Sequence, residues 1–336
     1  MTINFIIVSV FFCLMKPEVK KLLQNQQYGF AGNHSAVKVC TWTKKSLRDE
    51  DFCYKQKFYG IKSHLCCQMS PSVNFCQNSC IFCWRPIEHT EGVKIKGIKK
   101  LDEPEKIIED SIKAQKKQLS GFGGNEKINK LKLREAQNPM HFAISLTGEP
   151  TLYPKLAELI QSLHKKGKTT FLVTNGLNPE GIKKLEKEKA LPTQLYISMN
   201  APDEQLYKKI CSPKIRNFWK KYNESLKLMS KLRNKTRTTL RLTLVKNLNM
   251  VHPEDYAKLI KKANPFFVEV KAYMHVGYSR KRLQMENMPL HEEIKDFAKD
   301  ISKQSGYKII DEKKESRVVL LMQKDFKGRI MKFDES

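Results

Sequence analysis

Three cysteines in the stretch 74–86 are the residues of this sequence best suited to chemistry. Cys76, Cys80 and Cys83 follow the spacing C-x3-C-x2-C, and the run ends in Trp-Arg-Pro. Thiolates are soft ligands that suit the iron atoms of a 4Fe–4S cluster. Three thiolates leave one iron of such a cluster without a protein ligand. That iron is then open to a small molecule, and an open coordination position marks a reactive metal centre.

Three further cysteines show a second regularity, because Cys40, Cys53 and Cys66 are each thirteen residues apart. Three more thiolates predict a second 4Fe–4S cluster, again with one open iron. Cys67 is adjacent to Cys66 and would point elsewhere, so we prefer Cys66 as the third ligand. The alternatives are a structural zinc site for the first motif and buried free thiols for the second.

The spacing of the first motif resembles the signature of the radical S-adenosylmethionine (SAM) superfamily. This resemblance implies that the amino acid end of SAM occupies the open iron. It also implies an α/β fold, namely a partial (β/α)6 TIM-like barrel, here with an N-terminal cluster-binding extension.

The pattern of the chain agrees with such a fold. Strand-like and helix-like segments alternate in about six βα units starting at residue 73, which predicts a parallel sheet with right-handed crossovers. In such folds the chemistry lies at the C-terminal ends of the strands. The expected strands span residues 73–75, 141–146, 170–174, 194–199, 238–245, 267–274, 307–311 and 318–323. The expected helices span residues 17–26, 104–119, 127–136, 154–166, 179–187, 204–210, 218–232, 253–263 and 290–305.

We expect four parts in the chain. Residues 1–14 are read as a spurious or dispensable extension, because the apolar stretch 3–15 is too short to span a bilayer as a helix and Met15 looks like a fresh start. Residues 15–70 are expected to bind the second cluster, and their weak periodicity indicates that metal rather than a hydrophobic core fixes them. Residues 71–300 form the radical SAM core, and residues 301–336 form C-terminal strands.

One motif resembles the "GGE" motif with which the superfamily holds the amino group of SAM. Thr147, Gly148 and Glu149 end the strand that begins at His141, with Thr147 in place of the first glycine. Glycine lets a ligand approach the backbone closely. A simple turn with a helix-capping Thr151 is the alternative.

Two other strand ends are candidates for SAM contacts. Ser198 and Asn200 share one face of a strand at a period of two, and both could hydrogen-bond the ribose or carboxylate of SAM. Asn175 is followed by Gly176, for which ordinary turn chemistry is the alternative.

The charge of the chain points to a polyanion as partner. The 62 lysines and arginines against 35 acidic residues give a formal net charge of +27. Such a field speeds the capture of nucleic acid, although it says nothing about the fold. Seven of the nine cysteines lie between Cys40 and Cys83, whereas disulfide scaffolds are typical of small secreted domains. Reduced thiols that bind metal predict a cytoplasmic location, and we expect no membrane association.

The two cysteine patterns together resemble the tRNA 4-demethylwyosine synthase family. The match rests on C-x12-C-x12-C followed by C-x3-C-x2-C-W-R-P, with C-Y-K-x-K-F-Y-G-I-x-S-H between them, and it extends from Met15 to the C-terminal segments. The resemblance implies a lyase that condenses N1-methylguanosine (position 37 of tRNA-Phe) with pyruvate to form 4-demethylwyosine, the tricyclic-base step of wyosine biosynthesis. The first cluster would reduce SAM, and the resulting 5′-deoxyadenosyl radical would abstract hydrogen from the N1-methyl group.

The carbon radical would then attack pyruvate, which must be held and activated. The open iron of the second cluster could chelate pyruvate, and a lysine can form a Schiff base with a ketone. Lys55 follows Cys53 by two residues and is our preferred candidate, with Lys57 as the alternative. In so basic a chain, most lysines are solvated surface residues.

The remaining expectations concern partners. The basic loop Val276 to Leu283, with Tyr278, Arg280, Lys281 and Arg282, and the segment Lys94 to Lys100 are candidates for phosphate contacts to tRNA. His64 and His275 are expected to be structural. No flavodoxin-like domain is visible, so the resemblance implies the archaeal type, with an external electron donor of flavodoxin or ferredoxin type. We expect a monomer.

Two other functions stay open at this point. One is a different radical SAM enzyme with an auxiliary 4Fe–4S cluster that modifies RNA or a peptide. The other is a non-catalytic iron–sulfur or zinc module that binds RNA.

Overall fold

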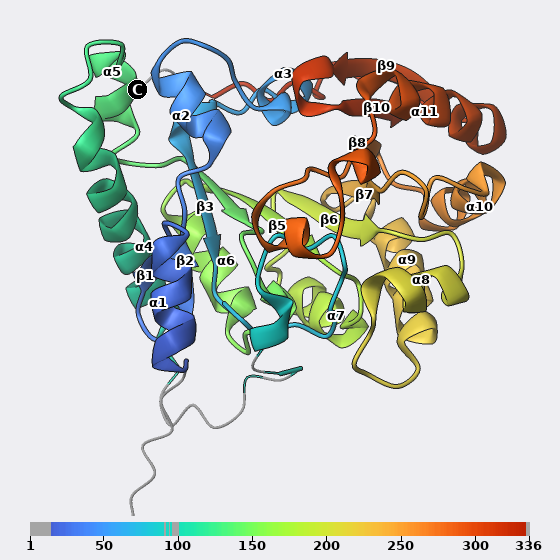
Figure 1. Cartoon of the computed structure of the whole chain (residues 1–336), viewed down its shortest axis with the longest axis horizontal. Coiled ribbons are helices and arrows are strands. Elements are labelled where there is room, and N and C mark those ends of the chain that lie inside the picture. Colours follow the sequence, from blue (N-terminus) through green and yellow to red (C-terminus); the bar gives the residue numbers. More distant parts are fainter. Residues whose placement is uncertain (1–14, 91, 94, 96–100, 334–336) are drawn as a thin grey trace, which may run out of the picture.

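The computed structural model describes residues 15–90, 92–93, 95 and 101–333. Within these ranges the chain forms a mixed sheet of ten strands flanked by helices (Figure 1). The expectation that residues 1–14 are dispensable lies outside the described residues, as do most residues of the basic segment Lys94 to Lys100.

Six parallel strands form the centre of the sheet, in the order β3-β4-β5-β6-β7-β8. Antiparallel strands extend it on both sides, β2 and β1 next to β3, and β10 and β9 next to β8. The described sheet is therefore open rather than closed, which confirms the partial barrel. The strands are β1 (Gly29–Ala31), β2 (Ser35–Val37), β3 (Cys66–Ser70), β4 (His141–Ile144), β5 (Thr169–Thr174), β6 (Gln194–Met199), β7 (Arg237–Leu244), β8 (Phe267–Ala272), β9 (Lys308–Lys313) and β10 (Val318–Met322).

Helices connect the parallel strands, as expected for βα units. Helices α4, α7, α9 and α10 and strand β6 begin and end at the predicted residues, whereas α2 and α3 were not predicted. The helices are α1 (Pro17–Asn25), α2 (Thr41–Leu47), α3 (Tyr54–Tyr59), α4 (Pro104–Leu119), α5 (Lys130–Glu135), α6 (Leu156–Lys165), α7 (Pro179–Lys187), α8 (Glu204–Cys211), α9 (Phe218–Leu232), α10 (Pro253–Ala263) and α11 (His291–Ser305).

One face of the sheet packs against the connecting helices. Leu195 and Ile197 of β6 are fully buried in the same core as Ile182 of α7 and Leu226 of α9. Burial of one such side chain stabilises the fold by about 1.5–3 kcal/mol. This face carries no candidate site residue, so it serves as the rigid support of the opposite face.

The opposite face, called the inner face below, packs against the N-terminal region. Phe171 of β5, Tyr196 of β6 and Phe267 of β8 form one core with Tyr54 and Phe58 of α3. Figure 1 shows α3 beside β9 and β10, the last strands of the chain. The N-terminal region therefore lies against the inner face, and its residues reach strands that are far away in the sequence.

The expectation that residues 73–75 form the first strand is wrong. These residues turn, and Asn74 has a φ of +70°, which a β-strand does not accommodate. The first parallel strand is β3, which ends at Ser70 and carries Cys66 and Cys67. Its sequence, Cys-Cys-Gln-Met-Ser, lacks the β-branched and aromatic residues that favour strands.

The N-terminal region also contains apolar cores, contrary to the expectation that metal alone fixes it. Its weak periodicity arises because its helices and strands are short. One core joins α1 and β2 to the segments that follow β3 and β4, and it contains Met15, Val19, Leu23, Tyr28, Ala36, Val73 and Leu146. In addition, no helix in the described ranges is long and apolar enough to cross a membrane.

Candidate active site

The first cysteine motif lies in the loop that follows β3, at the C-terminal edge of the parallel strands. The backbone N–H of Cys76 donates to the carbonyl oxygen of Gly92 (2.9 Å), and that of Ser79 donates to the carbonyl oxygen of Cys211 (2.9 Å). The charge of Cys80 acts on both Cys76 and Cys83, so the three thiols lie together. Cys76 is buried, whereas Cys80 and Cys83 are partly accessible.

Arg85 is a buried cation beside these three thiols. Its Nη1 donates to Thr90 Oγ1 (2.8 Å), and its Nη2 donates to the carbonyl oxygen of Asn78 (3.0 Å). Burial alone would lower the pKa of Arg85, but the neighbouring cysteines raise it. Burial raises the pKa of Cys76 to about 11, and Arg85 opposes this shift. Arg85 therefore favours the thiolate, which is the form that binds metal.

Gly148 brings the second motif against the cysteine loop. Its φ is +70°, and a Cβ atom at this position would lie 2.0 Å from the carbonyl oxygen of Ser72. The backbone N–H of Glu149 donates to the carbonyl oxygen of Phe75 (2.7 Å). Thr147 is buried beside Tyr28, with which it forms a hydrogen bond. The motif therefore needs glycine because backbone meets backbone here.

Glu149 is buried and held by several donors. Its Oε1 accepts from Thr151 N (3.1 Å), Thr151 Oγ1 (2.7 Å) and Thr174 Oγ1 (2.6 Å), and its Oε2 accepts from Asn175 N (2.7 Å). Burial raises the pKa of Glu149, and these hydrogen bonds oppose the shift. Because Oε2 accepts a single bond, it keeps a lone pair for a further donor.

The other SAM candidates lie in two places. The Nδ2 of Asn175 donates to Gln77 Oε1 (3.1 Å) and lies 3.8 Å from Cys76 Sγ, so Asn175 belongs to the cysteine loop. Ser198 is partly accessible on the inner face. Asn200 is buried, and its Oδ1 is among the buried side-chain oxygens that have no hydrogen-bond partner in the described structure. An orphaned buried acceptor of this kind suits a ligand donor.

Cys211 is a further thiol at this edge that the spacing of the cysteines did not reveal. Its Sγ accepts from Asn200 Nδ2 (3.7 Å) and forms a hydrogen bond with Cys80. Cys211 is not among the groups that most affect the pKa of Cys76 or that of Cys83. Cys211 therefore adjoins one member of the first group rather than completing a set of four.

The second cysteine group also comes together in space. Cys40 lies at the start of α2, Cys53 directly before α3, and Cys66 at the start of β3. The charges of Cys40 and Cys53 act on Cys66, and that of Cys40 acts on Cys53. Cys67 lies instead in the core on the helix-covered face, where burial alone raises its pKa. This arrangement agrees with the choice of Cys66 over Cys67.

Neither thiol group is as compact as a single tetrahedral zinc ion requires. Sulfur atoms around one tetrahedral zinc ion lie about 3.8 Å apart, since each Zn–S bond is about 2.3 Å. Neither group is so compact, because in the described part of the chain the trio with ligand atoms all within 4.8 Å of one another is His252, Glu254 and Asp255. An all-thiol donor set is compatible with iron–sulfur chemistry.

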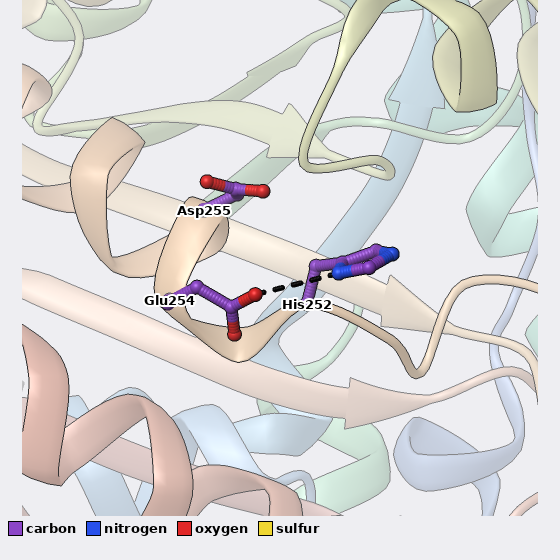
Figure 2. A group of neighbouring side chains, drawn as sticks. All are labelled: His252, Glu254 and Asp255. Carbon is purple, nitrogen blue, oxygen red and sulfur yellow. Dashed lines mark hydrogen bonds and ion pairs between the residues drawn. The ribbon is translucent and has the colours of Figure 1, made fainter.

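The compact trio itself is exposed at the start of α10 (Figure 2). His252 Nδ1 lies 3.3 Å from Glu254 Oε1, and the His252 side chain is 61% accessible. Acidic residues in a first helical turn are favourable without a metal, because they interact with the helix dipole. We therefore assign it no metal.

The two candidate lysines point in different directions. Lys55 is buried, and its Nζ lies over the rings of Tyr196 (4.6 Å to the centroid) and Phe171 (5.2 Å). Burial lowers the pKa of Lys55. Lys57 is exposed, and its Nζ pairs with Asp311 Oδ1 (2.9 Å). Of the two, the fold brings Lys55 to the second cysteine group and leaves Lys57 on the surface.

Charged residues around Lys55 escaped the sequence analysis. Glu269 of β8 is fully buried and accepts from Tyr54 OH (2.9 Å) and Tyr59 OH (2.7 Å). The charges of Glu269 and Arg241 of β7 both act on Lys55. Lys271 of β8 is close to Arg241, and burial lowers the pKa of Lys271 to about 8. Charged residues at alternate positions of apolar strands were the available signal, because such positions share one face.

Arg282, which we expected to contact phosphate, makes its hydrogen bonds within the protein instead. Its guanidinium donates to the carbonyl oxygens of Ile81 (3.0 Å), Cys83 and Arg85, and it pairs with Glu88 (2.6 Å). Arg282 therefore holds the cysteine loop from outside.

Three other residues of this loop remain available at the surface. Arg280 and Lys281 are exposed, and Lys281 Nζ lies over the ring of Tyr278 (4.5 Å).

The two histidines that we expected to be structural both have side-chain partners. His64 Nε2 lies 2.6 Å from Glu135, and His275 Nδ1 lies 3.1 Å from Tyr273 OH.

Two family models match the chain. Residues 70–260 match the radical SAM superfamily, and residues 262–323 match the family described as wyosine base formation. The first range contains the cysteine loop and the GGE-like motif, and the second contains β8 to β10.

Relatives described as S-adenosyl-L-methionine-dependent tRNA 4-demethylwyosine synthases match nearly the whole chain. The protein of Pyrococcus horikoshii is 52% identical over 312 residues, covering 93% of this chain and 90% of that protein. The protein of Methanocaldococcus jannaschii is 42% identical over 320 residues, covering 94% and 98%. The mouse protein is 38% identical over 316 residues, and the match covers 43% of its greater length.

Two solved structures are similar to this one. A structure of TYW1 with a lysine-pyruvate adduct bound has a TM-score of 0.81 at 40% identity, covering 92% of this chain and 97% of that one. A crystal structure of archaeal TYW1 has a TM-score of 0.75 at 36% identity, covering 92% and 96%.

Gly148→Ala should destabilise the protein more than Gly167→Ala. Both glycines have positive φ (+70° and +68°), but an added Cβ atom meets Ser72 O only at Gly148, since Gly167 has nothing within 4 Å. The left-handed conformation costs each alanine about 1–2 kcal/mol. The clash should lower the free energy of unfolding of Gly148→Ala by at least about 2 kcal/mol more, measured by anaerobic urea denaturation. Equal losses would contradict the close backbone contact.

Arg282→Gln should loosen the cysteine loop, whereas Arg280→Gln should not. Hydrogen bonds to a charged group contribute about 1.5–3 kcal/mol each, so amide hydrogen exchange of residues 76–86 should be at least about tenfold faster in Arg282→Gln. Arg280→Gln should leave exchange unchanged and weaken RNA binding in a salt-dependent way, as expected for a lost phosphate contact. Identical exchange in the two variants would show that Arg282 does not hold the loop.

Proposed function

This chain belongs to the tRNA 4-demethylwyosine synthase family, and from that membership we propose how its own residues carry out the family's reaction. The chain is a radical SAM enzyme that condenses N1-methylguanosine of tRNA with pyruvate to form 4-demethylwyosine, a step of wyosine biosynthesis. The observation that carries the proposal is the buried Lys55 beside Cys53 and Cys66, in a chain similar to a TYW1 structure that holds a lysine-pyruvate adduct.

Cys76, Cys80 and Cys83 hold the 4Fe–4S cluster in this proposal. When bound, the cluster supplies the electron that cleaves SAM into methionine and a 5′-deoxyadenosyl radical. Arg85 offsets the negative charge of the thiolates, which would otherwise be costly to bury. Arg282 fixes the loop through its hydrogen bonds to the carbonyl oxygens of Ile81, Cys83 and Arg85, so the three thiols that would hold the cluster keep their positions.

The strand ends beside the cysteine loop hold SAM. Oε2 of Glu149 accepts a hydrogen bond from the amino group, and the GGE-like motif keeps Glu149 in place through its contact with Phe75. Asn175, which lies against Cys76, and Ser198 on the inner face of β6 are assigned to SAM as further polar contacts. The unpaired Oδ1 of Asn200 is a further acceptor for a SAM hydroxyl group.

Lys55 activates pyruvate. Its amine adds to the C2 carbonyl, and loss of water leaves an imine whose carbon is attacked by the radical formed when hydrogen is abstracted from the N1-methyl group. The rings of Tyr196 and Phe171 flank the amine of Lys55 and keep it away from the surface. Lys57, which pairs with Asp311, takes no part.

Cys40, Cys53 and Cys66 bind a second 4Fe–4S cluster in this proposal. Support comes from their mutual proximity and from their position on the inner face, next to Lys55. A cluster here would lie beside the pyruvate rather than beside SAM.

The tRNA approaches the edge of the sheet where Tyr278, Arg280 and Lys281 are accessible. The target base must leave the anticodon stack to reach the inner face, which a base-flipping enzyme achieves. We place the reaction in the cytoplasm, where tRNA and reduced thiols occur together. A separate flavodoxin- or ferredoxin-type protein supplies the electrons, and the enzyme acts as a monomer.

Lys55→Ala should abolish transfer of label from pyruvate into tRNA, whereas Lys57→Ala should retain it. The assay uses the reconstituted enzyme, SAM, dithionite, labelled pyruvate and tRNA that carries N1-methylguanosine. Both variants lose one lysine of the same short helix, so the comparison separates the buried amine from general charge. Full activity of Lys55→Ala would reject the Schiff base, and absence of label with the unchanged enzyme would reject the function itself.

Cys66→Ala should lower the iron content of the anaerobically reconstituted enzyme from about eight atoms per chain to about four. Cys67→Ala should keep about eight, because Cys67 faces the opposite side of β3. Cys66→Ala should still cleave SAM, since the first group is intact. Four irons in the unchanged enzyme, or equal loss in both variants, would contradict the second cluster.

A further inference from the structure

Arg241 is a partly buried cation to which the reaction described above gives no role. It lies on β7 at a position of the inner face, and it is partly accessible while its neighbours Leu240 and Leu242 are fully buried. Its guanidinium contacts Tyr54. Within the described residues, no ion pair joins Arg241 to a carboxylate.

The surroundings of Arg241 hold more positive than negative charge. Arg241, Lys55 and Lys271 face one carboxylate, that of Glu269, whose two oxygens accept from tyrosine hydroxyls. The Nζ of Lys271 donates to the carbonyl oxygen of Ser316. The carboxylate of Glu269 is thus shared by three cations, and a further anion that binds beside them would be favourable.

The cysteines of the second group can balance the positive charge of the two lysines but not that of Arg241. Cys53 acts on both Lys55 and Lys271, and Cys66 acts on Lys55. The groups that dominate the electrostatics of Arg241 are Tyr54, Glu269 and Tyr196, with no cysteine among them. Arg241 therefore shares the carboxylate of Glu269 with both lysines and has no cysteine to balance its charge, so it can pair with a further anion.

The position of Arg241 relative to Lys55 fits a small bound acid. Both side chains lie against the same aromatic ring, with Lys55 Nζ 4.6 Å and Arg241 Cζ 5.9 Å from the centroid of Tyr196. The amine and the guanidinium are thus neighbours around a single ring. A three-carbon acid joined to Lys55 through C2 carries its carboxylate one bond from that carbon, so the acid can extend towards this guanidinium.

We propose that Arg241 binds the carboxylate of the oxo acid that condenses with Lys55, and so selects 2-oxo acids over uncharged ketones. The inference rests on the Schiff-base role of Lys55 proposed above and adds a specificity determinant to it. The planar guanidinium matches the two oxygens of a carboxylate, which the single ammonium of a lysine cannot do. The carboxylate is then anchored by protein rather than by the open iron of the second cluster.

The test traps the imine in the reconstituted holoenzyme with borohydride, which reduces it to a stable secondary amine on Lys55. Pyruvate and acetone are titrated separately, and the adduct is quantified by mass spectrometry of the peptide that contains Lys55. In Arg241→Gln, the half-saturating concentration of pyruvate should rise about 10- to 100-fold, the usual effect of losing a charge-assisted pair. That of acetone should stay unchanged, so the preference for pyruvate disappears.

Two further variants keep the result interpretable. Arg237→Gln removes an arginine from the same strand and face, but this arginine donates to the carbonyl oxygens of Gly328 and Arg329. It should leave the preference for pyruvate intact. Arg241→Lys keeps the charge without the planar fork and should lie between the unchanged enzyme and Arg241→Gln. If Arg241→Gln does not retain its iron, the ratio of the two half-saturating concentrations in Arg241→Lys decides.

Three outcomes would overturn the inference, and they are distinguishable. Unchanged trapping of pyruvate in Arg241→Gln would show that the carboxylate is held elsewhere. Equal loss of pyruvate and acetone trapping would show that Arg241 positions Lys55 instead of binding the acid. If the unchanged enzyme itself yields no adduct, the proposed chemistry of Lys55 fails together with the inference.

Discussion

The structure depends on one close backbone contact, that of Gly148 with the carbonyl oxygens of Ser72 and Phe75. Because Gly148 has no side chain, the end of β4 can lie directly against the cysteine loop that follows β3. This contact places Glu149, whose carboxylate is held in turn by Thr174 and Asn175 at the end of β5. Three successive parallel strands thus end in a single hydrogen-bonded network. This network, and not the loop alone, fixes the positions of the thiols of Cys76, Cys80 and Cys83.

A second constraint is the cost of burying charge, which each part of the site meets in its own way. Arg85 is enclosed together with three thiols, and Glu269 is enclosed with two tyrosine hydroxyls. Both arrangements supply partners for a group that would be expensive to bury alone. The inner face can carry these charges because it also holds the smaller apolar core around Phe171, Tyr196 and Phe267, while the opposite face carries the larger core. The chemistry is therefore confined to one face, and both faces contribute to the stability of the fold.

The sequence was most informative where the signal is local. Cysteine spacing predicted both thiol groups, and hydrophobic periodicity predicted β6 and the longer helices. Lys55 and Lys57 could not be separated by position, because α3 was not predicted. Residues two apart on a helix point about 200° away from each other. Arg241 and Glu269 were missed because their importance arises from contacts with Tyr54, which is far away in the sequence. Residues 73–75 were mistaken for a strand because Val73 and Phe75 are apolar, although both are buried in a turn.

Strand β3 sets the distance between the two thiol groups. It begins with Cys66 of one thiol group and leads directly into the loop that carries the other group. Its five residues span roughly 16 Å at about 3.3 Å per residue. It is hydrogen-bonded to β2 on one side and β4 on the other, so it can neither stretch nor bend freely. The strand acts as a fixed-length spacer, and its register is as important as its length. A shift by one residue would turn Cys66 towards the helices and Cys67 towards the inner face. The separation of the two thiol groups is thus set by a rigid element of the sheet.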